Sequence, residues 1–248
     1  MSRQKLKTLR RLIHRRHLSC KLLNYLGVNL KLKKYHDLIV AADGSAASGK
    51  TTGARLISKK YGLQFLSSGL LYRYASFQLL KHKPKNTDLF LKKNFKNLNL
   101  KKLNNKFLHS PKISAHTSII AKEKKIRNIL KIFQKKFAKK FNKVCIEGRD
   151  IGTVILPKAD IKFFFKCNLN VAAKRRFKEL RKTNKRITLT EVRKAMRIRD
   201  NLDKKRKNSP LIQAENAVIV PTDKLNINDM VNKMSKIIEK RIKEKYGS

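Results

Sequence analysis

The segment 44–51 carries the most specific chemistry in the chain. It reads GSAASGKT and matches G-x-x-x-x-G-K-[ST], a loop whose backbone N–H groups wrap the phosphates of a nucleotide. In such a loop Lys50 offers a positive charge to a phosphoryl group in transfer, and the Thr51 hydroxyl can ligate Mg²⁺. We therefore expect a nucleotide to bind at Gly44, Ser45, Ala46, Ala47, Ser48, Gly49, Lys50, Thr51 and Thr52.

Three later segments combine arginines and carboxylates with glycine or other small residues. They are 66–73 (LSSGLLYR), 147–153 (EGRDIGT) and 199–211 (RDNLDKKRKNSPL). An arginine guanidinium binds phosphate oxygens in a bidentate manner, and a carboxylate accepts hydrogen bonds from a base amino group or a ribose hydroxyl. In a protein that already holds one nucleotide, a second arginine-rich pocket predicts a second phosphorylated substrate.

At these residues the chain resembles the cytidylate (CMP) kinase family of P-loop nucleoside monophosphate kinases. The resemblance runs from about Leu38 to the C-terminus and depends on three ordered runs: Ser-Gly-x-x-Tyr-Arg, Gly-Arg-Asp-x-Gly-Thr and Arg-Asp-x-x-Asp-x-x-Arg-x-x-x-Pro-Leu. It implies Mg²⁺-dependent phosphoryl transfer from ATP to CMP or dCMP, with no covalent enzyme intermediate. It also implies an α/β, three-layer P-loop NTPase fold, with a mostly parallel five-stranded sheet, helices on both faces, a small NMP-binding insert and a lid.

The resemblance also assigns roles to individual residues. It places CMP against Ser68, Tyr72, Arg73, Ser118, Arg127, Arg149, Asp150, Asp203 and Arg206. Within this set the phosphate is expected at Ser68, Arg73 and Arg149, the cytosine edge at Ser118, Arg127 and Asp150, and the ribose at Asp203 and Arg206. The catalytic charges are expected from Lys50, Arg199 and Arg206. Arg199 lies in the predicted lid, whose closure excludes water and favours transfer over hydrolysis of ATP.

Each of these residues also has a purely structural interpretation. The loop could be an ordinary strand-to-helix turn, and Arg199 and Arg206 could be exposed helix cations. Asp150 and Ser68 could cap helices, because short polar side chains bind the first backbone N–H groups of a helix. The register of the carboxylates and arginines in the three runs favours the functional interpretation.

The chain departs from the family pattern at several positions. Ser67 stands where the family usually has an aspartate, so one acidic contact near the acceptor or the Mg²⁺ is missing. Leu202 stands where the family often has a lid arginine, and Lys204 or Lys205 would lack the bidentate fork. Ser45 replaces a frequent loop proline.

The composition is strongly basic, with 63 Lys+Arg against 16 Asp+Glu and a formal charge of +47. Such a charge attracts polyanions, so nonspecific attraction to nucleic acid is expected. The basic residues are spread along the chain, which favours solvated helix faces over one binding patch. Two alternatives stay open: a nucleic-acid-binding protein that keeps a kinase-like core, and a P-loop kinase with another small acceptor.

Apolar runs alternate with helix-compatible segments along the chain. Strands are expected at 38–42, 63–66, 144–146, 161–165 and 217–220. Helices are expected at 52–61, 70–80, 118–141, 170–182 and 190–205, and in a C-terminal segment with Val231, Met234 and Ile238 on one stripe. This alternation predicts a parallel sheet that helices cover on both faces.

The motifs suggest a division of the chain into a basic extension and one kinase domain. The extension is expected at 1–37 and the domain at 38–248, with the insert or NMP-binding region at about 81–117 and the lid at about 183–210. The Lys/Asn-rich stretch 81–112 has weak periodicity and is expected to be a surface excursion or a small insert. The cysteines show no metal or redox spacing, and Cys145 and Cys167 are expected in the core.

The sequence also suggests a cellular setting. No apolar run approaches the length of a transmembrane helix, so no membrane association is expected. We expect a cytoplasmic monomer, or an organellar protein if residues 1–37 are a transit peptide. A nucleic-acid-binding arm and an upstream extension from a misassigned start codon are the other interpretations of that segment.

Overall fold

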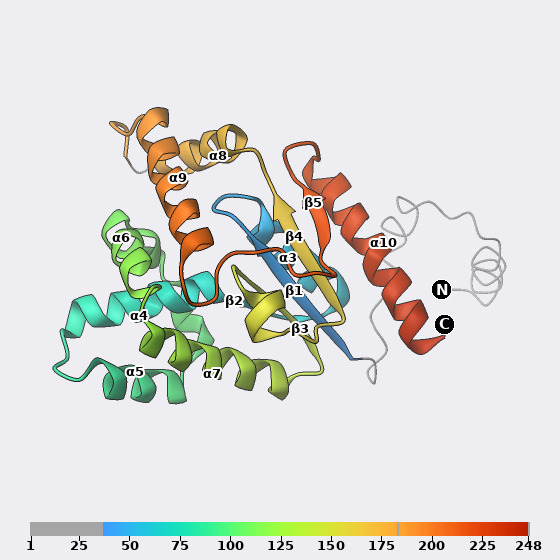
Figure 1. Ribbon diagram of the computed structural model, residues 1–248, viewed down its shortest axis with the longest axis horizontal. Coiled ribbons are helices and arrows are strands. Elements are labelled where there is room, and N and C mark those ends of the chain that lie inside the picture. Colours follow the sequence, from blue (N-terminus) through green and yellow to red (C-terminus); the bar gives the residue numbers. More distant parts are fainter. Residues whose placement is uncertain (1–36, 183, 248) are drawn as a thin grey trace, which may run out of the picture.

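A single parallel sheet forms the centre of the computed structural model, which describes residues 37–182 and 184–247 (Figure 1). Its strand order is β2-β3-β1-β4-β5 and every neighbouring pair is parallel. The strands are β1 (Leu38–Gly44), β2 (Gln64–Ser67), β3 (Lys143–Gly148), β4 (Ile161–Lys166) and β5 (Val218–Pro221). The predicted strands and the predicted fold class are therefore confirmed.

The central strand β1 is buried on both faces, which explains its continuous apolar run. Because successive side chains of a strand point to opposite faces, Ala41 packs into one hydrophobic cluster while Val40 and Ala42 pack into the other. In register, Asp43 at the end of β1 lies opposite Gly148 of β3 and Phe164 of β4. The carboxyl ends of β2 and β3 thus bring the segments 66–73 and 147–153 to one edge of the sheet.

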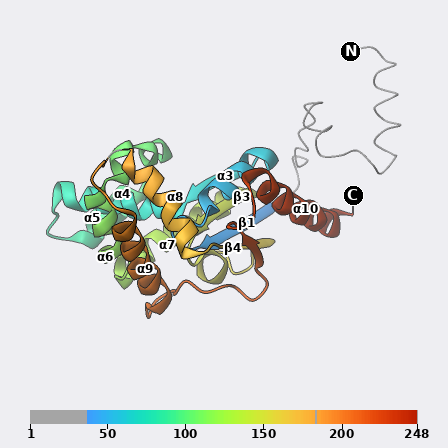
Figure 2. The ribbon, with the colours of Figure 1, turned by 90° about the horizontal axis from the view of Figure 1, so that it is seen from above.

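Helices cover both faces of the sheet, as predicted. α3 (Lys50–Tyr61) and α10 (Ile227–Tyr246) bury their apolar sides with Val40 and Ala42. α4 (Ser68–His82) and α7 (Lys124–Lys140) pack into the cluster that contains Ala41. Figure 2 shows α10 toward one end of the molecule and α4 toward the other.

The segment predicted as one long helix at 118–141 is two helices, so that prediction is wrong. α6 (Pro111–Ile120) ends before a short turn, and α7 begins at Lys124. No glycine or proline marks the break in the sequence. The Arg127 Nη1 donates a hydrogen bond to the Ala121 carbonyl at 3.1 Å, which satisfies an acceptor that a continuous helix would have used.

The stretch 81–112 is helical and partly buried, so the first of its two expected forms, a surface excursion, is wrong. It contains α5 (Thr87–Lys96) and the short helices η1 (Leu100–Asn104) and η2 (Lys106–His109). Their apolar residues Leu91, Phe95, Leu103 and Leu108 join the main core. The asparagines Asn86, Asn99 and Asn105 accept backbone N–H bonds as N-caps, which gives a structural role to residues that resembled a loop signal.

Helices α8 (Leu169–Arg181) and α9 (Leu189–Lys205) project beyond the carboxyl end of the sheet (Figure 1). They pack on each other through a small cluster of Ala172, Ala173, Val192 and Met196. Thr188 caps α9 in a reciprocal arrangement with Glu191, which fixes where the helix begins. The helix starts and ends agree with the predicted segments to within one residue.

Some expectations concern single residues or lie outside the described part of the chain. Cys145 is fully buried as predicted, whereas Cys167 is only partly buried and contacts Arg175 at 3.6 Å. Residues 1–36, which include Cys20 and most of the predicted basic extension, lie outside the described residues. Among the described residues, no helix combines the length and apolar character needed to cross a membrane.

Candidate active site

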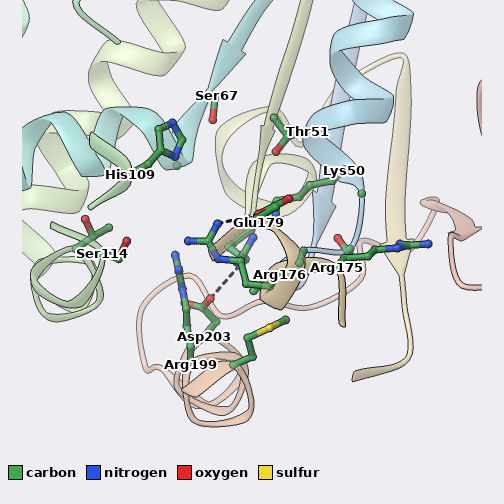
Figure 3. Close-up of a pocket in the computed structure, with 18 of the residues that line it drawn as sticks. Lys50, Thr51, Ser67, His109, Ser114, Arg175, Arg176, Glu179, Arg199 and Asp203 are labelled. Atoms are coloured by element: carbon green, nitrogen blue, oxygen red, sulfur yellow. Dashed lines mark hydrogen bonds and ion pairs between the residues drawn. The ribbon is translucent and has the colours of Figure 1, made fainter. Parts of the chain in front are cut away.

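A large cavity opens at the carboxyl end of the strands, where ligands bind in open α/β sheets (Figure 3). Its volume is about 1860 Å³. A pocket for one small molecule measures roughly 300–1,000 Å³, so this cavity has room for two nucleotides. Loop 46–52, the start of α4, helix α6, the turn after β3, and helices α8 and α9 all contribute to its wall.

The phosphate loop has the geometry that its sequence predicts. Gly49 and Ala47 adopt left-handed backbone angles, with φ of 81° and 51°, so consecutive N–H groups can converge on an anion. A Cβ atom at Gly44 would lie 2.6 Å from the Phe165 carbonyl oxygen, so only glycine fits beside β4. The Thr222 hydroxyl donates a hydrogen bond to the Ser48 carbonyl at 2.8 Å and supports the loop from the end of β5.

Lys50 projects into the cavity from the start of α3 and is almost entirely buried. Its Nζ donates to the Ser45 carbonyl at 3.2 Å and lies 3.9 Å from the Glu147 carboxylate. Burial, together with the positive charges of Arg149 and Arg199, lowers the pKa of Lys50 to about 7, and Glu147 opposes this shift. An added anion beside Lys50 would stabilise its charged form.

Ser67, where the sequence departs from the family pattern, has two structural roles. Its hydroxyl caps α4 by accepting the Leu70 N–H at 3.3 Å, and it donates a short hydrogen bond to Glu147. Ser68 is buried on the cavity wall and is not the N-cap, so its proposed capping role is wrong. Glu147 therefore remains as a buried carboxylate between Ser67 and Lys50.

Arg149 connects the phosphate loop to α9. Its Nη1 donates to the Gly44 carbonyl at 2.8 Å, and its Nε pairs with the Asp203 carboxylate at 2.9 Å. Burial disfavours the ionised form of Asp203, but Arg149, Arg199 and Arg206 hold its pKa below the ordinary value. The Arg149 side chain thus bridges the phosphate loop at Gly44 and helix α9 at Asp203.

Asp150 lies at the centre of a second ionic cluster. Its carboxylate pairs with Arg127 at 2.5 Å and with Arg206 at 3.7 Å, and Arg206 also pairs with Asp203 at 3.2 Å. Asp150 precedes the short helix η3 (Ile151–Ile155) but makes no side-chain cap bond, so it is not a capping residue. Arg206 follows α9 and is nearly buried, so it is not an exposed helix cation.

The remaining residues predicted to bind CMP lie along the wall of the same cavity. The Arg127 guanidinium lies over the Tyr72 ring at 5.6 Å, a cation–π contact, and burial raises the Tyr72 pKa to about 12. Arg73 donates to the Leu108 carbonyl and to Ser114, both at 2.8 Å. Ser118 also lines the cavity, on α6 rather than on the helix of Arg127.

Helix α9 contributes two charged side chains that face the phosphate loop. Arg199 lies in the cavity, and burial together with Arg149 lowers its pKa (Figure 3). The Asp200 carboxylate accepts the Ala46 N–H at 3.1 Å and so docks α9 on the loop. Leu202, the second departure from the family pattern, lines the cavity as an apolar side chain.

Several cavity residues were not predicted from the sequence. Arg175 binds the Thr222 carbonyl at 2.6 Å, and Arg176 pairs with Glu179 at 2.9 Å. Both arginines lie on α8 within a long basic stretch, where nothing in the sequence distinguishes them from solvated cations. The other cavity residues outside the predicted site set are Glu147, His109, Ser114 and Glu179. Glu147 lies in the run 147–153 that the sequence analysis singled out, and this was the signal available for it.

The family model described as cytidylate kinase matches residues 40–240. The chain belongs to the cytidylate kinase family. A cytidylate kinase from Fusobacterium nucleatum is 37% identical over 215 residues, which covers 82% of this chain and 98% of that protein. Cytidylate kinases from Rickettsia rickettsii and Bartonella tribocorum are 35% and 41% identical, and cover 87% and 76% of this chain and 99% and 88% of their own lengths.

A solved structure also resembles this cytidylate kinase family member in fold. It is an uncharacterized protein from Eubacterium ventriosum, with a TM-score of 0.50 and 15% sequence identity, and it covers 82% of this chain and 98% of that chain. At this identity the likeness concerns the fold alone.

Proposed function

We propose that this protein transfers the terminal phosphoryl group of ATP to CMP, which gives ADP and CDP. The observation that carries this proposal is one cavity with two anion-binding halves, joined by Arg149. The phosphate loop forms one half, and the arginine–carboxylate cluster around Asp150 forms the other. The named relatives, which align over nearly their whole length, support the same reaction.

On the donor side, the loop and Lys50 would hold the phosphates of ATP. Backbone N–H groups at the start of α3 point at an anion and cost no reorganisation when it binds. The low pKa of Lys50 in the free protein reflects a buried cation among arginines, and phosphate oxygens would restore its full charge. Arg149, Arg176 and Arg199 line the same part of the cavity and would neutralise charge on the transferring group.

The cavity offers oxygen ligands that fit Mg²⁺. The Thr51 hydroxyl and the Glu147 carboxylate both line it, and Mg²⁺ prefers one or two such ligands together with substrate phosphates and water. Among the described residues, no group of three or more acidic, histidine or cysteine side chains is placed so that it could hold a metal ion by itself. When bound, Mg²⁺ would neutralise the developing charge on the phosphate oxygens.

On the acceptor side, unsatisfied buried donors support nucleotide recognition. Within the described residues, the Arg127 Nε and the Arg206 Nη2 are buried without a hydrogen-bond partner. The Arg206 Nη2 lies 3.7 Å from Asp150, too far for a hydrogen bond, and both arginines line the cavity, so a bound nucleotide could supply the missing acceptors. We assign cytosine to Asp150 with Arg127 and Ser118, ribose to Asp203 with Arg206, and phosphate to Ser68, Arg73 and Arg149.

Transfer would then depend on position and charge rather than on covalent chemistry. The acceptor phosphate and the donor phosphate meet between Arg149 and Lys50, so the attacking oxygen and the leaving group can lie in line. We assign the lid to about 183–210 and the NMP-binding region to about 81–117. Contact of α9 with the phosphate loop through Asp200 would exclude water from the reacting groups.

A single coupled assay tests this function. ADP formation is measured with ATP and Mg²⁺ over CMP, dCMP, UMP and AMP. We expect turnover with CMP or dCMP well above that with AMP. Turnover with AMP alone would replace the proposal with a kinase for another acceptor, and gel filtration of the same sample would test the proposed monomer.

Two further assignments concern the cell. We propose a cytoplasmic enzyme with the extension at 1–37 as a separate segment. The N-terminus of the mature protein, determined by Edman sequencing or mass spectrometry, tests whether that segment is removed as a transit peptide.

A second candidate property, attraction to nucleic acid, has one specific observation in its favour. Helix α7 carries exposed lysines at 124, 125, 135, 136, 139 and 140 and a half-buried lysine at 131, and no acidic residue occurs in the sequence from 124 to 146. Like charges four residues apart destabilise a helix. By contrast, Lys240 and Arg241 of α10 both pair with Glu244. A phosphate backbone would relieve the repulsion along α7.

A further inference from the structure

The strand before the phosphate loop, β1, carries near its end a buried carboxylate that the mechanism above does not use. Asp43 closes β1, its side chain is only 4% exposed, and it does not line the cavity. Asp43 therefore touches neither substrate, and its contribution must come through other residues.

Both carboxylate oxygens of Asp43 bind the turn that follows β3. The Ile151 N–H donates to Oδ1 at 2.8 Å, and the Gly152 N–H donates to Oδ2 at 2.7 Å. A carboxylate that accepts two backbone N–H groups makes charge-assisted bonds, which are about twice as strong as neutral ones. Both oxygens of Asp43 are therefore engaged in holding this turn.

These two N–H groups directly follow the residues that contact both substrates in the proposed reaction. Arg149 and Asp150 precede Ile151, so holding the backbone at 151 and 152 restrains the turn from which both side chains start. The neighbouring Gly44 carbonyl accepts the Arg149 guanidinium at 2.8 Å. The end of β1 thus holds the turn at two points, once through a side chain and once through the backbone.

We propose that Asp43 is a positioning residue, which orients Arg149 and Asp150 for CMP by binding the backbone N–H groups of Ile151 and Gly152. This inference rests on the proposed function. Loss of the contact would let the turn move, and small displacements of binding groups have large effects on affinity and rate.

The close approach of the turn to Asp43 depends on glycine at position 152. A Cβ atom there would lie 3.3 Å from the Asp43 Oδ2 and 3.2 Å from the Lys162 Cδ. The methyl group of Gly152→Ala should therefore push the turn away from the Asp43 carboxylate, and this variant changes no charge. It provides a second variant that tests the same contact independently of Asp43→Asn.

The protein also contains a matched control at the other end of β1. Asp160 accepts the Ile39 N–H at 2.8 Å and pairs with Lys245 at 2.9 Å. Ile39 lies near the start of β1, whereas the cavity opens at the carboxyl end of the strands. Asp160→Asn removes a carboxylate that supports the same strand through the same kind of bond. A purely structural role of Asp43 would make the two aspartate variants behave alike.

Steady-state kinetics with full-length protein test the proposal. For Asp43→Asn and Gly152→Ala we expect KM for CMP to rise roughly tenfold, the effect of losing one bond to a charged group, while KM for ATP stays within about twofold. Preference for CMP over UMP should fall in both variants. Asp160→Asn should keep both KM values, even if its melting temperature falls as far.

A pH profile separates positioning from mere stability. Burial raises the pKa of Asp43 to about 6, with a contribution from Asp150, against the two backbone bonds and Lys50. The groups that face this contact are Asp150, Lys50 and Lys162. Because the protonated carboxyl has one good acceptor fewer, kcat/KM for CMP in the wild type should fall as pH drops through about 6. Asp43→Asn should lack this fall.

Amide hydrogen exchange gives a readout that needs no activity. In Asp43→Asn, exchange at Ile151 and Gly152 should be faster than in wild type, with the rest of β1 protected. If the wild type does not phosphorylate CMP, the proposed function fails; if it does, and KM for CMP is unchanged in both variants or rises equally in Asp160→Asn, the role of Asp43 is wrong.

Discussion

At the scale of single residues, Lys50 joins the phosphate loop to the carboxylate of Glu147. Its position at the start of α3 places a buried cation where charge develops during phosphoryl transfer. Lys50→Ala should lower kcat by about 10²–10³-fold or more, the range for removing one preorganised charge donor. Near-wild-type turnover in the coupled assay would contradict the mechanism.

The pH dependence of kcat/KM for ATP gives a second test of the role of Lys50. Since its pKa in the free protein is lowered to about 7, the charged form is lost as pH rises through that value, and kcat/KM for ATP should fall there. In Lys50→Arg the side chain stays charged, so the fall near pH 7 should disappear even though the point charge is differently placed.

Asp150 is the residue whose change should affect base recognition most directly. Asp150→Ala leaves Arg127 and Arg206 without their shared carboxylate partner, and it removes the proposed acceptor for the cytosine amino group. We expect KM for CMP to rise and the CMP-to-UMP preference to fall by roughly 10–100-fold, because leaving buried charges unpaired is costly. Unchanged preference would show that another residue reads the base.

At the scale of secondary-structure elements, α9 is held against the phosphate loop by its own carboxylates. Asp200 accepts the Ala46 N–H and Asp203 pairs with Arg149, one on each half of the cavity. This pairing explains how a helix in the predicted lid can respond to both substrates. It also gives a structural role to Asp200 and Asp203, two of the few acidic residues in the chain.

Loss of the Asp200 contact should loosen closure of α9. In Asp200→Ala we expect about tenfold lower kcat/KM and an ADP yield that exceeds the CDP yield, because water then reaches the donor phosphate. Asp200→Asn keeps an acceptor oxygen and should behave more like the wild type. Equal ADP and CDP yields in Asp200→Ala would rule out a role in water exclusion.

The elements also show where local sequence signals were insufficient. The strands and α3 were predicted correctly because a buried strand and a glycine loop have local signatures in a few residues. The break between α6 and α7 has no such signature, since it depends on Arg127 reaching the Ala121 carbonyl. The helices within 81–112 were missed because their capping asparagines and lysines resembled a loop.

At the scale of the whole molecule, the formal charge is +47, and the few acidic residues neutralise some helices more than others. α10 carries Glu239 and Glu244 among its lysines and arginine, and these form ion pairs. α7 carries none, and the views in Figures 1 and 2 place it with α5 at the end of the molecule away from α10. A polyanion should therefore bind α7 in preference to α10.

Salt-dependent binding of a labelled single-stranded RNA tests this surface. Lys124, Lys131, Lys135 and Lys139 are changed together to Gln, and the control changes Lys233, Lys236, Lys240 and Lys243 of α10 in the same way. The slope of log K against log salt should fall by about one for each lysine that contacts phosphate in the α7 variant, and by less in the control. Equal slopes in both variants would assign the binding to diffuse charge.

The sequence by itself determined the parts of this protein that are local. The phosphate loop, the strands, the order of the motifs and the family all follow from residues close together in the chain. The family resemblance of the same motifs also predicted which arginines and aspartates would share a site, and these residues line one cavity.

Only the tertiary structure decided which of these residues contact one another. Asp43 and Ile151 lie 108 positions apart in the chain, Gly44 and Arg149 lie 105 apart, and Ala46 and Asp200 lie 154 apart. No propensity or spacing encodes such pairs, because their distance depends on strand register and helix packing. For that reason the role of Asp43 and the docking of α9 could be inferred only once β1, β3 and α9 had been placed in space.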